Sequence, residues 1–485
     1  MLKGIDKRKL FITINILCCF LFFIVHVYFV HVHEAWRDEA QAWVLVKNSS
    51  LVELFSLFSS EGHPSLWFLT IFPFVKLGLD FSLFSYVSLT LVTIALFLFL
   101  SFGELPYWIK IAVMFSSIFF YFNPVISRIY SVLVLLIIML GLVWKKRQDH
   151  MILYGIIIAL LFQSHILMCG LAIGCVVDIV LIICEKNRTK NGYCALFIAL
   201  FSFLLMLLEL WQRTSGPVAQ EVSLKSVLSQ FSVTNIVNGI FSIANHSGTL
   251  VRGCAVFLVF GCYFCYVLYA VWKQKENLYY VNELVVIFFA CAGYLGVVCF
   301  VRAALHMQMA ICFNMIMFLA CWMLYANGGP IIRRCSICVI LLIAVVSYSP
   351  TFDGIKTDVY GDFSKSKEMA HYICDTMDDK DIVIVENQPT TPAVYAYVSS
   401  ISGEPQFVDI STNGKYKYMQ WGIPYIVEHS ESEIRDFASN LQNEETDKVY
   451  YLSDKLLRSE VSFDLIKRCD NDNVWGEKYY LYLIE

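Results

Sequence analysis

The chain has 485 residues, of which 58% are hydrophobic and only 16% are charged, and its mean hydropathy is +0.63. Soluble domains are about 45–50% apolar and about 25% charged, so this composition excludes an ordinary soluble enzyme and indicates a polytopic α-helical membrane protein. The net charge of −4 and the lack of a basic stripe argue against nucleic acid as a partner.

Eleven apolar runs are candidate membrane spans. They cover roughly residues 10–31, 81–102, 107–125, 129–144, 150–166, 168–184, 194–211, 253–272, 282–301, 307–326 and 335–349. Lysine and arginine accumulate in cytoplasmic loops. The basic residues before the first run, Lys3 to Lys9, therefore predict a cytoplasmic N-terminus. The basic loops that begin at Lys145, Lys186, Lys273 and Arg333 then all fall on the cytoplasmic side. This agreement supports about eleven spans.

Two outer segments are expected to be helical without crossing the membrane. The segment 64–80 is apolar but short, and counting it as a span would move every later basic loop to the outside. We therefore predict an interfacial or re-entrant helix within a first outer loop, 32–80, although a crossing helix remains the alternative. The stretch 212–252 predicts one or two amphipathic helices over the outer mouth.

After residue 350, charged residues become frequent and long apolar runs stop. The pattern predicts helices at 365–376, 391–400 and 431–441, and strands at 381–385, 406–410, 448–452 and 478–484. This alternation predicts a small α/β domain with a mostly parallel sheet. We therefore divide the chain into a membrane domain, 1–350, and an extracytoplasmic domain, 351–485, since eleven spans from a cytoplasmic start end outside.

The stretch 33–43 follows the first span and is rich in ionisable residues. Such residues at the exit of a membrane helix are costly and are functional candidates. Asp38 and Glu39 are candidate catalytic carboxylates, with Asp38 a general base or a ligand of a divalent metal. The neighbouring Trp36 and Trp43 argue against a freely solvated loop. The alternative is that the acids are solvated, or form salt bridges or helix caps.

Other polar residues are expected near the same outer surface. His63 lies in a Gly-Pro turn, Arg128 lies between two spans, and Arg302 and His306 are four residues apart on one helix face. These four residues are candidates for phosphate binding, because arginine in particular suits phosphate recognition. The alternatives are a structural turn histidine and interfacial anchors. His165 lines a cavity or caps a helix. The candidates for the substrate pocket are Trp36, Gln41, Trp43, Tyr130 and His165.

The joint order of three motifs resembles the GT-C glycosyltransferases. The motifs are Trp36-Arg37-Asp38-Glu39-Ala40-Gln41-Ala42-Trp43, Gly62-His63-Pro64-Ser65-Leu66-Trp67 and Ser127-Arg128-Ile129-Tyr130. More narrowly, the chain is similar to bacterial relatives of the protein O-mannosyltransferases and the lipid A aminoarabinose transferases. The order and spacing match over roughly residues 1–170, and the later spans match only in kind. The C-terminal domain resembles the outer domain of many such bacterial proteins.

The resemblance implies an enzyme of the bacterial cytoplasmic (inner) membrane. It would transfer a hexosyl or pentosyl group from a polyprenyl-phosphate donor to a glycan, lipid or protein acceptor in the cell envelope. The catalytic aspartate falls on Asp38. A second carboxylate that is often found after the third span in oligosaccharyltransferases is missing, because 123–131 contains no Asp or Glu. We therefore expect no cofactor and do not favour a divalent metal.

In the expected mechanism, Asp38 accepts the proton of an acceptor hydroxyl, and direct attack inverts the anomeric carbon. Arg128 and Arg302 stabilise the charge that develops on the leaving phosphate, assisted by His63 or His165. Two alternatives belong to other classes: a transporter or flippase of a lipid-linked saccharide, and a non-catalytic envelope assembly protein. The spans contain few charges apart from Asp178 and Glu209, and no inverted repeat is evident, which disfavours the transporter.

Overall fold

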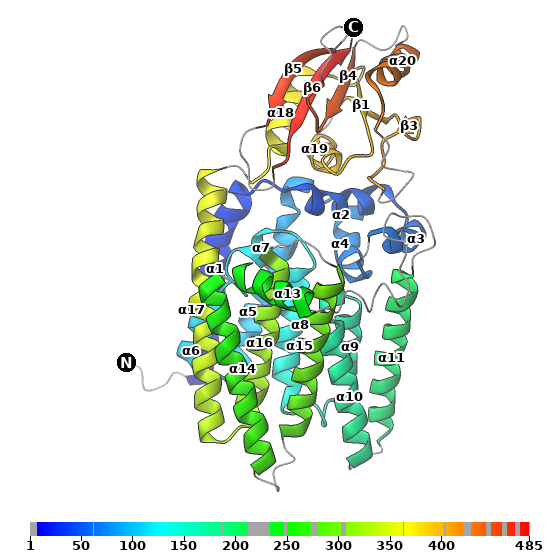
Figure 1. The fold of residues 1–485 in the computed structure, drawn as a ribbon. Helices are drawn as coiled ribbons and strands as arrows, with labels where there is room; N and C mark the ends of the chain where they lie inside the picture. The colour runs from blue at the N-terminus through cyan, green and yellow to red at the C-terminus, as the bar shows by residue number, and fades with distance from the viewer. Residues whose placement is uncertain are drawn as a thin grey trace.

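The computed structural model describes residues 7–484 except 62, 186–188, 212–232, 247–249, 274–279, 302–306, 362, 402–403, 421–427, 443–447, 458–462 and 471–475. A helical bundle lies below, a cap of short helices covers one of its ends, and a small domain with one sheet lies on the cap (Figure 1). The polytopic helical protein with a small C-terminal α/β domain is therefore confirmed.

Every apolar run predicted as a span contains helix. The bundle consists of α1 (Lys7–Val32), α5 (Ser85–Phe102), α6 (Tyr107–Met114), α7 (Phe122–Val125), α8 (Tyr130–Trp144), α9 (Met151–Phe162), α10 (Cys169–Glu185), α11 (Lys190–Leu210), α14 (Leu250–Lys273), α15 (Val281–Val301), α16 (Met307–Asn327) and α17 (Pro330–Tyr360). Among the described residues, eight helices are long and apolar enough to cross a membrane. The runs 107–125, 129–144 and 150–166 instead form broken or shorter helices, so the count of eleven spans stays a prediction.

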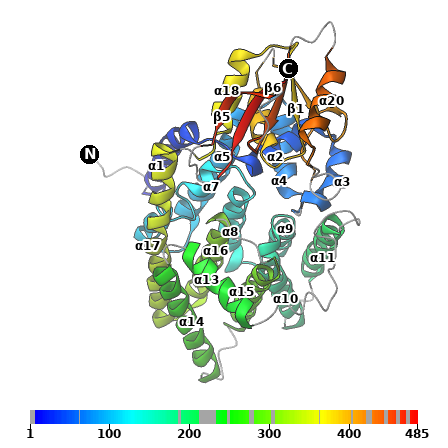
Figure 2. The ribbon, with the colours of Figure 1, turned by 45° about the horizontal axis from the view of Figure 1, so that its top comes forward.

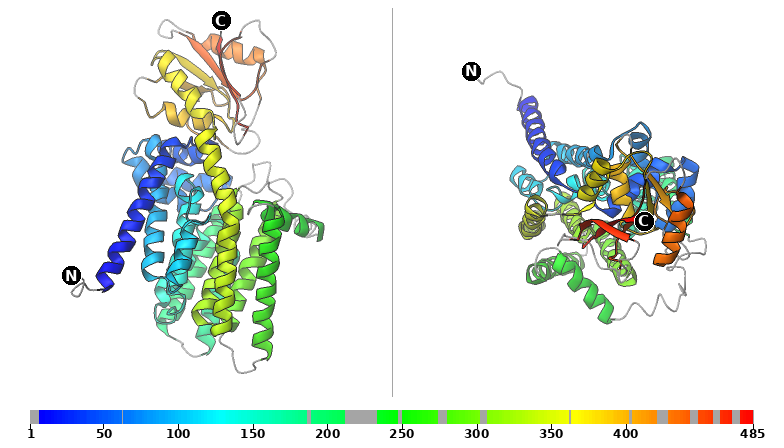
Figure 3. Two further views of the ribbon diagram at one scale, coloured as in Figure 1. Left: turned by 90° about the vertical axis from the view of Figure 1, so that its left-hand side faces the viewer. Right: turned by 90° about the horizontal axis from the view of Figure 1, so that it is seen from above.

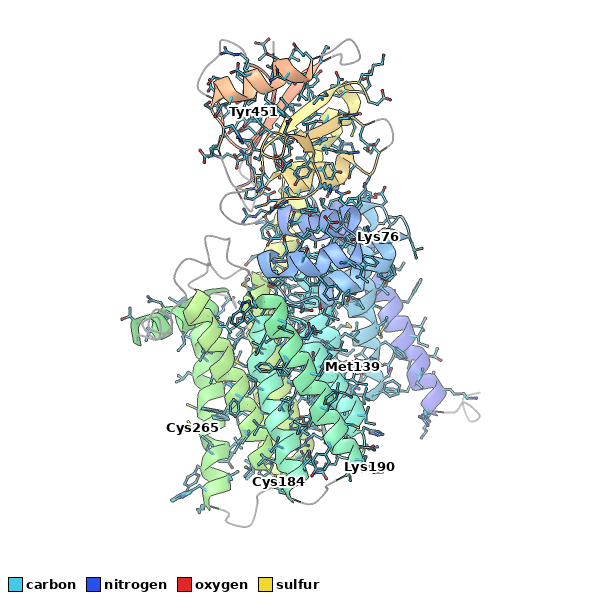
Figure 4. All side chains as sticks on the ribbon, turned by 90° about the vertical axis from the view of Figure 1, so that its right-hand side faces the viewer. Lys76, Met139, Cys184, Lys190, Cys265 and Tyr451 are labelled. Carbon is cyan, nitrogen blue, oxygen red and sulfur yellow. The ribbon has the colours of Figure 1, made fainter. Side chains whose placement is uncertain are left out.

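The position of each helix in the bundle follows from its apolar surface. Helix α16 is almost wholly buried, whereas most residues of α1 and α14 are not buried in the bundle and many of their apolar side chains are exposed. Both lie at the edge of the bundle (Figure 3). Because exposed apolar side chains of this kind need an apolar solvent, the outer surface of the bundle fits a lipid environment. Cys184 and Lys190 lie at the end of the bundle opposite the cap and Lys76, as the predicted topology requires (Figure 4).

Helices α10 and α15 approach each other closely through glycines. A Cβ atom on Gly170 would lie 2.4 Å from the carbonyl oxygen of Phe289 and 2.8 Å from the Cα atom of Gly293. A Cβ atom on Gly174 would lie 2.9 Å from the Cα atom of Val286. These distances are too short for any larger residue, so the small residues permit backbone-to-backbone packing of the kind found between membrane helices.

The cap contains α2 (Arg37–Asn48), α3 (Leu51–Glu61) and α4 (Leu66–Lys76). These helices lie directly beneath the C-terminal domain (Figure 2). Helix α4 has 11 residues, which corresponds to about 16 Å, roughly half of the hydrocarbon core. Its length and its place in the cap agree with the predicted interfacial helix in 64–80. In the stretch 212–252, α13 (Val233–His246) is helical as predicted, while 212–232 and 247–249 lie outside the described residues.

The C-terminal domain has a mixed six-stranded sheet in the order β3-β2-β1-β4-β6-β5. Its elements are α18 (Ser366–Thr376), β1 (Ile382–Val385), α19 (Thr391–Val398), β2 (Gln406–Asp409), β3 (Gly414–Lys415), α20 (Glu431–Leu441), β4 (Val449–Ser453), β5 (Phe463–Cys469) and β6 (Tyr479–Ile484). All three predicted helices and four predicted strands are present.

The prediction of a mostly parallel sheet is wrong. Strand β1 pairs in parallel with β2 and β4, but β2–β3, β4–β6 and β5–β6 are antiparallel pairs. The sequence pattern misses β3 and β5. Strand β3 has only two residues, and β5 is an edge strand whose central residues are exposed or half-buried, so neither forms an apolar run. The hydrophobic pattern therefore did not reveal these two strands, and it did not reveal that β6 runs antiparallel to β4.

The C-terminal domain is joined to the bundle by α17 and rests on α2. Helix α17 continues through the predicted boundary at 350 to Tyr360. The side-chain amide of Gln41 donates to the carbonyl oxygen of Met419 at 2.8 Å, and the amide of Ala35 donates to the hydroxyl of Tyr397 at 2.9 Å. The domain therefore lies at the same end of the bundle as the loop 32–80.

Candidate active site

A cavity of about 110 Å³ lies between α2, the start of α4, the turn after α7 and the C-terminal domain. Four of the predicted site residues line it: Asp38, Gln41, His63 and Arg128. The lining also includes Arg37 and Trp67, which the sequence motifs contain but which had no predicted role, and Pro389 and Met419 from the C-terminal domain. The structure thus brings together side chains from segments far apart in the sequence.

Asp38 lies in the first turn of α2, between two guanidinium groups. Its Oδ2 atom is 3.1 Å from Nη1 of Arg128, and its Oδ1 atom is 3.5 Å from Nε of Arg37. The carboxylate therefore lies at the positive end of a helix dipole and between two guanidinium groups, which attract it and fix its position. About a fifth of the side chain is exposed (19%), so a ligand in the cavity can reach the carboxylate.

Arg128 is held in a fixed orientation by aromatic rings. Its guanidinium carbon lies 5.7 Å from the centroid of Trp36 and 5.5 Å from that of Tyr130, distances at which cation–π attraction operates. The side chain is only 10% exposed. A guanidinium carries five N–H donors in a rigid fork, more than the carboxylate of Asp38 uses, so Arg128 can also bind a phosphate.

The two predicted histidines lie side by side next to the cavity. The ring centroids of His63 and His165 are 5.2 Å apart. Burial and the nearby Arg128 lower the pKa of His63 to about 4, against the opposing effect of Asp38, so this imidazole is neutral at pH 7. The amide of Leu167 donates to Nδ1 of His165 at 3.2 Å, so His165 caps the 3-10 helix η2 (Ile166–Met168) and carries its proton on Nε2.

Several buried polar atoms around the cavity have no hydrogen-bond partner among the described residues. Three belong to residues that line it: Oε1 of Gln41, Nδ1 of His63 and Nε1 of Trp67. The hydroxyl of Tyr130 and Nε2 of His165 belong to residues that contact Arg128 and His63 from behind the lining. Each buried polar group left unpaired costs about 1–3 kcal/mol. A concentration of such atoms at one cavity is therefore expected where a polar ligand binds.

Glu39, the other predicted catalytic carboxylate, does not line the cavity. Its Oε1 atom lies 3.0 Å from Nε2 of His33 and accepts from the amide of Trp36 at 3.3 Å, and its Oε2 atom accepts from the amide of Ser127. The side chain is fully buried. Glu39 thus forms the salt bridge and helix cap that the sequence left open as its alternative, and it fixes the residue before Arg128.

A buried ionic network behind the cavity was not predicted. Nδ1 of His33 lies 3.0 Å from Oδ2 of Asp358, which also accepts from the hydroxyl of Tyr121 at 2.7 Å. Burial alone would lower the pKa of His33, but Asp358 and Glu39 raise it to about 10. Tyr121 has a φ of +74°, a strained conformation for a residue with a side chain. Asp358 is 325 residues from His33, and no local signal in the sequence links the two.

The remaining predicted residues lie elsewhere. Trp36 packs against Arg128, as described. The ring of Trp43 packs against Phe81 in a tilted arrangement, and its centroid lies 4.7 Å from the ammonium of Lys47. Trp36, Trp43, Tyr130 and His165 do not line the cavity, although Trp36 and Tyr130 contact Arg128 and His165 contacts His63. Arg302 and His306 lie outside the described residues.

No metal site is found in the part of the chain that the structure describes: no group of three or more His, Cys, Asp or Glu side chains is arranged to hold an ion. Two Cys-x-x-Cys spacings occur, at 262–265 and 335–338, and they lie within the apolar helices α14 and α17. All four cysteines are free.

Two solved structures align with almost the whole chain. ArnT from Cupriavidus metallidurans in the apo state aligns over 96% of this chain and 97% of its own, with 12% identity and a TM-score of 0.39. ArnT from the same organism bound to undecaprenyl phosphate aligns over 97% of both chains, with 10% identity and a TM-score of 0.40. No family model and no curated protein match the chain. The chain is thus similar to these structures in its overall course, with few identical residues.

Proposed function

We propose that the chain is a membrane glycosyltransferase that moves a sugar from a polyprenyl-phosphate donor to an acceptor on the outer face of the bacterial cytoplasmic membrane. The observation that carries this proposal is the contact between Asp38 and Arg128 at one cavity. A reachable carboxylate and a fixed guanidinium supply the two groups that this reaction needs. The motifs shared with the GT-C glycosyltransferases point to the same chemistry.

In the proposed reaction, the phosphate of the lipid-linked sugar binds Arg128 and Arg37. The N–H groups of the two arginines are shared between this phosphate and the carboxylate of Asp38. The acceptor oxygen or nitrogen attacks the anomeric carbon and forms the new bond, while its proton passes to the carboxylate of Asp38. The bond between the anomeric carbon and the phosphate oxygen breaks, and the lipid phosphate leaves with the electron pair. Arg128 stabilises the charge that develops there, because fixed cations aimed at a developing anion lower the barrier.

The remaining cavity groups have supporting roles in this proposal. His63 is neutral near pH 7, so it donates or accepts a hydrogen bond without adding charge beside the two arginines. Gln41 and Trp67 present unpaired polar atoms suited to sugar hydroxyls. A volume of about 110 Å³ is below the roughly 300–1,000 Å³ of a typical small-molecule site. The cavity therefore fits the reacting end of a donor whose lipid chain stays in the membrane.

The first experiment identifies the substrates. Mass spectrometry of envelope glycolipids and glycans from cells with and without the protein should show a sugar modification that depends on it. The purified protein is then supplied with the matching polyprenyl-phosphate sugar and acceptor. We expect Asp38→Asn to reduce transfer about 10²–10⁴-fold, the usual contribution of a positioned general base.

The matched control is Asp353→Asn, which changes an exposed aspartate on α17 away from the cavity. It should retain wild-type transfer. If Asp38→Asn transfers sugar at the wild-type rate, Asp38 is not the base. If the wild-type protein transfers no sugar from any such donor but moves labelled lipid-linked saccharide between leaflets, the protein is a flippase.

A further inference from the structure

A second and larger cavity, of about 380 Å³, lies where the C-terminal domain meets the bundle. Its walls come from the end of α1, from η1 (Phe81–Leu83) and the start of α5, and from α18 and α19. It shares no lining residue with the candidate active site. Its volume lies within the range of about 300–1,000 Å³ typical of small-molecule sites.

The cavity is lined by more basic than acidic side chains. Lys367 and His371 lie four residues apart on one face of α18, and His31 comes from the last turn of α1. None of these three side chains has an ion-pair partner among the described residues. Buried His33, already paired with two carboxylates, also borders the cavity. The one acidic residue in the lining, Asp80, accepts from the amide of Ser82 at 2.7 Å.

The remaining lining adds hydrogen-bond donors to these basic side chains. The hydroxyls of Ser82 and Tyr86 border the cavity and form no hydrogen bond with another described residue. A group with several acceptor oxygens and a negative charge matches three unpaired basic side chains and two hydroxyls. Phosphate has this chemistry.

The position of the cavity favours a phosphate that is attached to a membrane lipid. His31 lies in the last turn of one candidate span, Lys7–Val32, and Phe81 begins another, Phe81–Phe102, so both spans leave the apolar bundle at the cavity. Leu83, which lines the cavity, exposes about half of its surface. A headgroup in the cavity would leave its hydrocarbon chains against this apolar surface, whereas a free phosphate would not use it.

We propose that this cavity binds the phosphate headgroup of a membrane lipid and thereby ties α18 of the C-terminal domain to the membrane surface. Glycerophospholipids and polyprenyl phosphates both carry this group. The proposal is independent of the proposed transferase activity, because Asp38 and Arg128 lie in the other cavity.

The test measures lipid retention by native mass spectrometry. Full-length protein in a neutral detergent is titrated with phosphatidylglycerol, with polyprenyl phosphate, with phosphatidylcholine and with inorganic phosphate. We expect one of the two anionic lipids to bind the wild-type protein. Its affinity for the double variant Lys367→Gln/His371→Gln should be lower by about tenfold or more, because each basic residue near an anionic headgroup adds to affinity. Lys367→Arg, which keeps the charge, should retain binding.

The matched control is Lys380→Gln/His150→Gln, which makes the same substitutions at exposed positions outside the cavity. It should bind like the wild type, and equal melting temperatures of the two double variants exclude misfolding. The preferred anionic lipid identifies the source of the phosphate. Equal lipid binding by both double variants, or binding of inorganic phosphate without either anionic lipid, would overturn the proposal.

Discussion

His33 is a buried cation between two buried carboxylates, and its replacement should destabilise the protein in a pH-dependent way. In His33→Gln, the charges of Glu39 and Asp358 lose their shared partner. A pKa raised from 6.5 to about 10 corresponds, at 1.36 kcal/mol per pKa unit, to about 5 kcal/mol of unfolding free energy. Breaking a buried ion pair by removing one partner costs about 3–5 kcal/mol, so two independent routes agree.

The sign of the pH dependence follows from the direction of this shift. The folded protein holds the proton of His33 more tightly than the unfolded chain, so the stabilisation is complete below about pH 6.5. It is lost as the pH rises through about 10. The difference in unfolding free energy between wild type and His33→Gln should therefore be largest near pH 6 and should narrow toward pH 10.

The assay is unfolding in a mild detergent, followed by tryptophan fluorescence at pH 6, 8 and 10. His150→Gln, at an exposed position outside this network, is the matched control and should unfold like the wild type at each pH. A gap between wild type and His33→Gln that stays constant from pH 6 to pH 10 would show that His33 is not held as a cation. A gap below 1 kcal/mol at pH 6 would refute the network as a source of stability.

Three further predictions follow from other contacts. Arg128→Lys keeps the charge but loses the forked set of N–H donors, so the Kd for a polyprenyl-phosphate donor should rise about tenfold or more. An unchanged Kd in a binding titration would show that Arg128 does not bind the phosphate. Gly170→Ala places a Cβ atom 2.4 Å from a carbonyl of α15 and should cost about 1–3 kcal/mol in thermal unfolding. In the control Gly261→Ala, the added Cβ atom meets no other atom within 4 Å, so the stability should not change. Equal losses of stability in the two variants would contradict the close packing of α10 and α15. Arg147 pairs with Asp178 through two hydrogen bonds, so Arg147→Met should strongly lower the free energy of unfolding. The double variant Arg147→Met/Asp178→Leu should recover much of this loss, because it leaves no unpaired buried charge. A double variant that is no more stable than Arg147→Met would contradict this prediction.

Much of the fold was predictable because its signals are local. Apolar runs identify the membrane helices, and the alternation of short helices and strands after residue 350 identifies the C-terminal domain. Strands β3 and β5 were missed because β3 has only two residues and edge strand β5 has no apolar run, and the antiparallel direction of the predicted strand β6 was not visible in its sequence. Strand pairing depends on partners far along the chain, which a hydrophobic pattern does not specify.

The candidate site was predictable in part for the same reason. Asp38, Gln41, His63 and Arg128 stand out as polar residues at the ends of apolar runs, and they do line one cavity. The sequence did not reveal that Pro389 and Met419 of the C-terminal domain close that cavity, or that Asp358 pairs with His33. These contacts join segments hundreds of residues apart, and only the packing of the C-terminal domain on α2 brings them together.

The sequence alone thus determined that a membrane protein places acidic and aromatic residues just after its first span. It named Asp38 as the expected general base and Glu39 as a second candidate, with a salt bridge or helix cap as the alternative for Glu39. The tertiary structure distinguished them, because neighbouring residues on a helix point about 100° apart. That rotation directs Asp38 toward the cavity and Arg128, and it directs Glu39 into the protein, where His33 and the amide of Ser127 hold it.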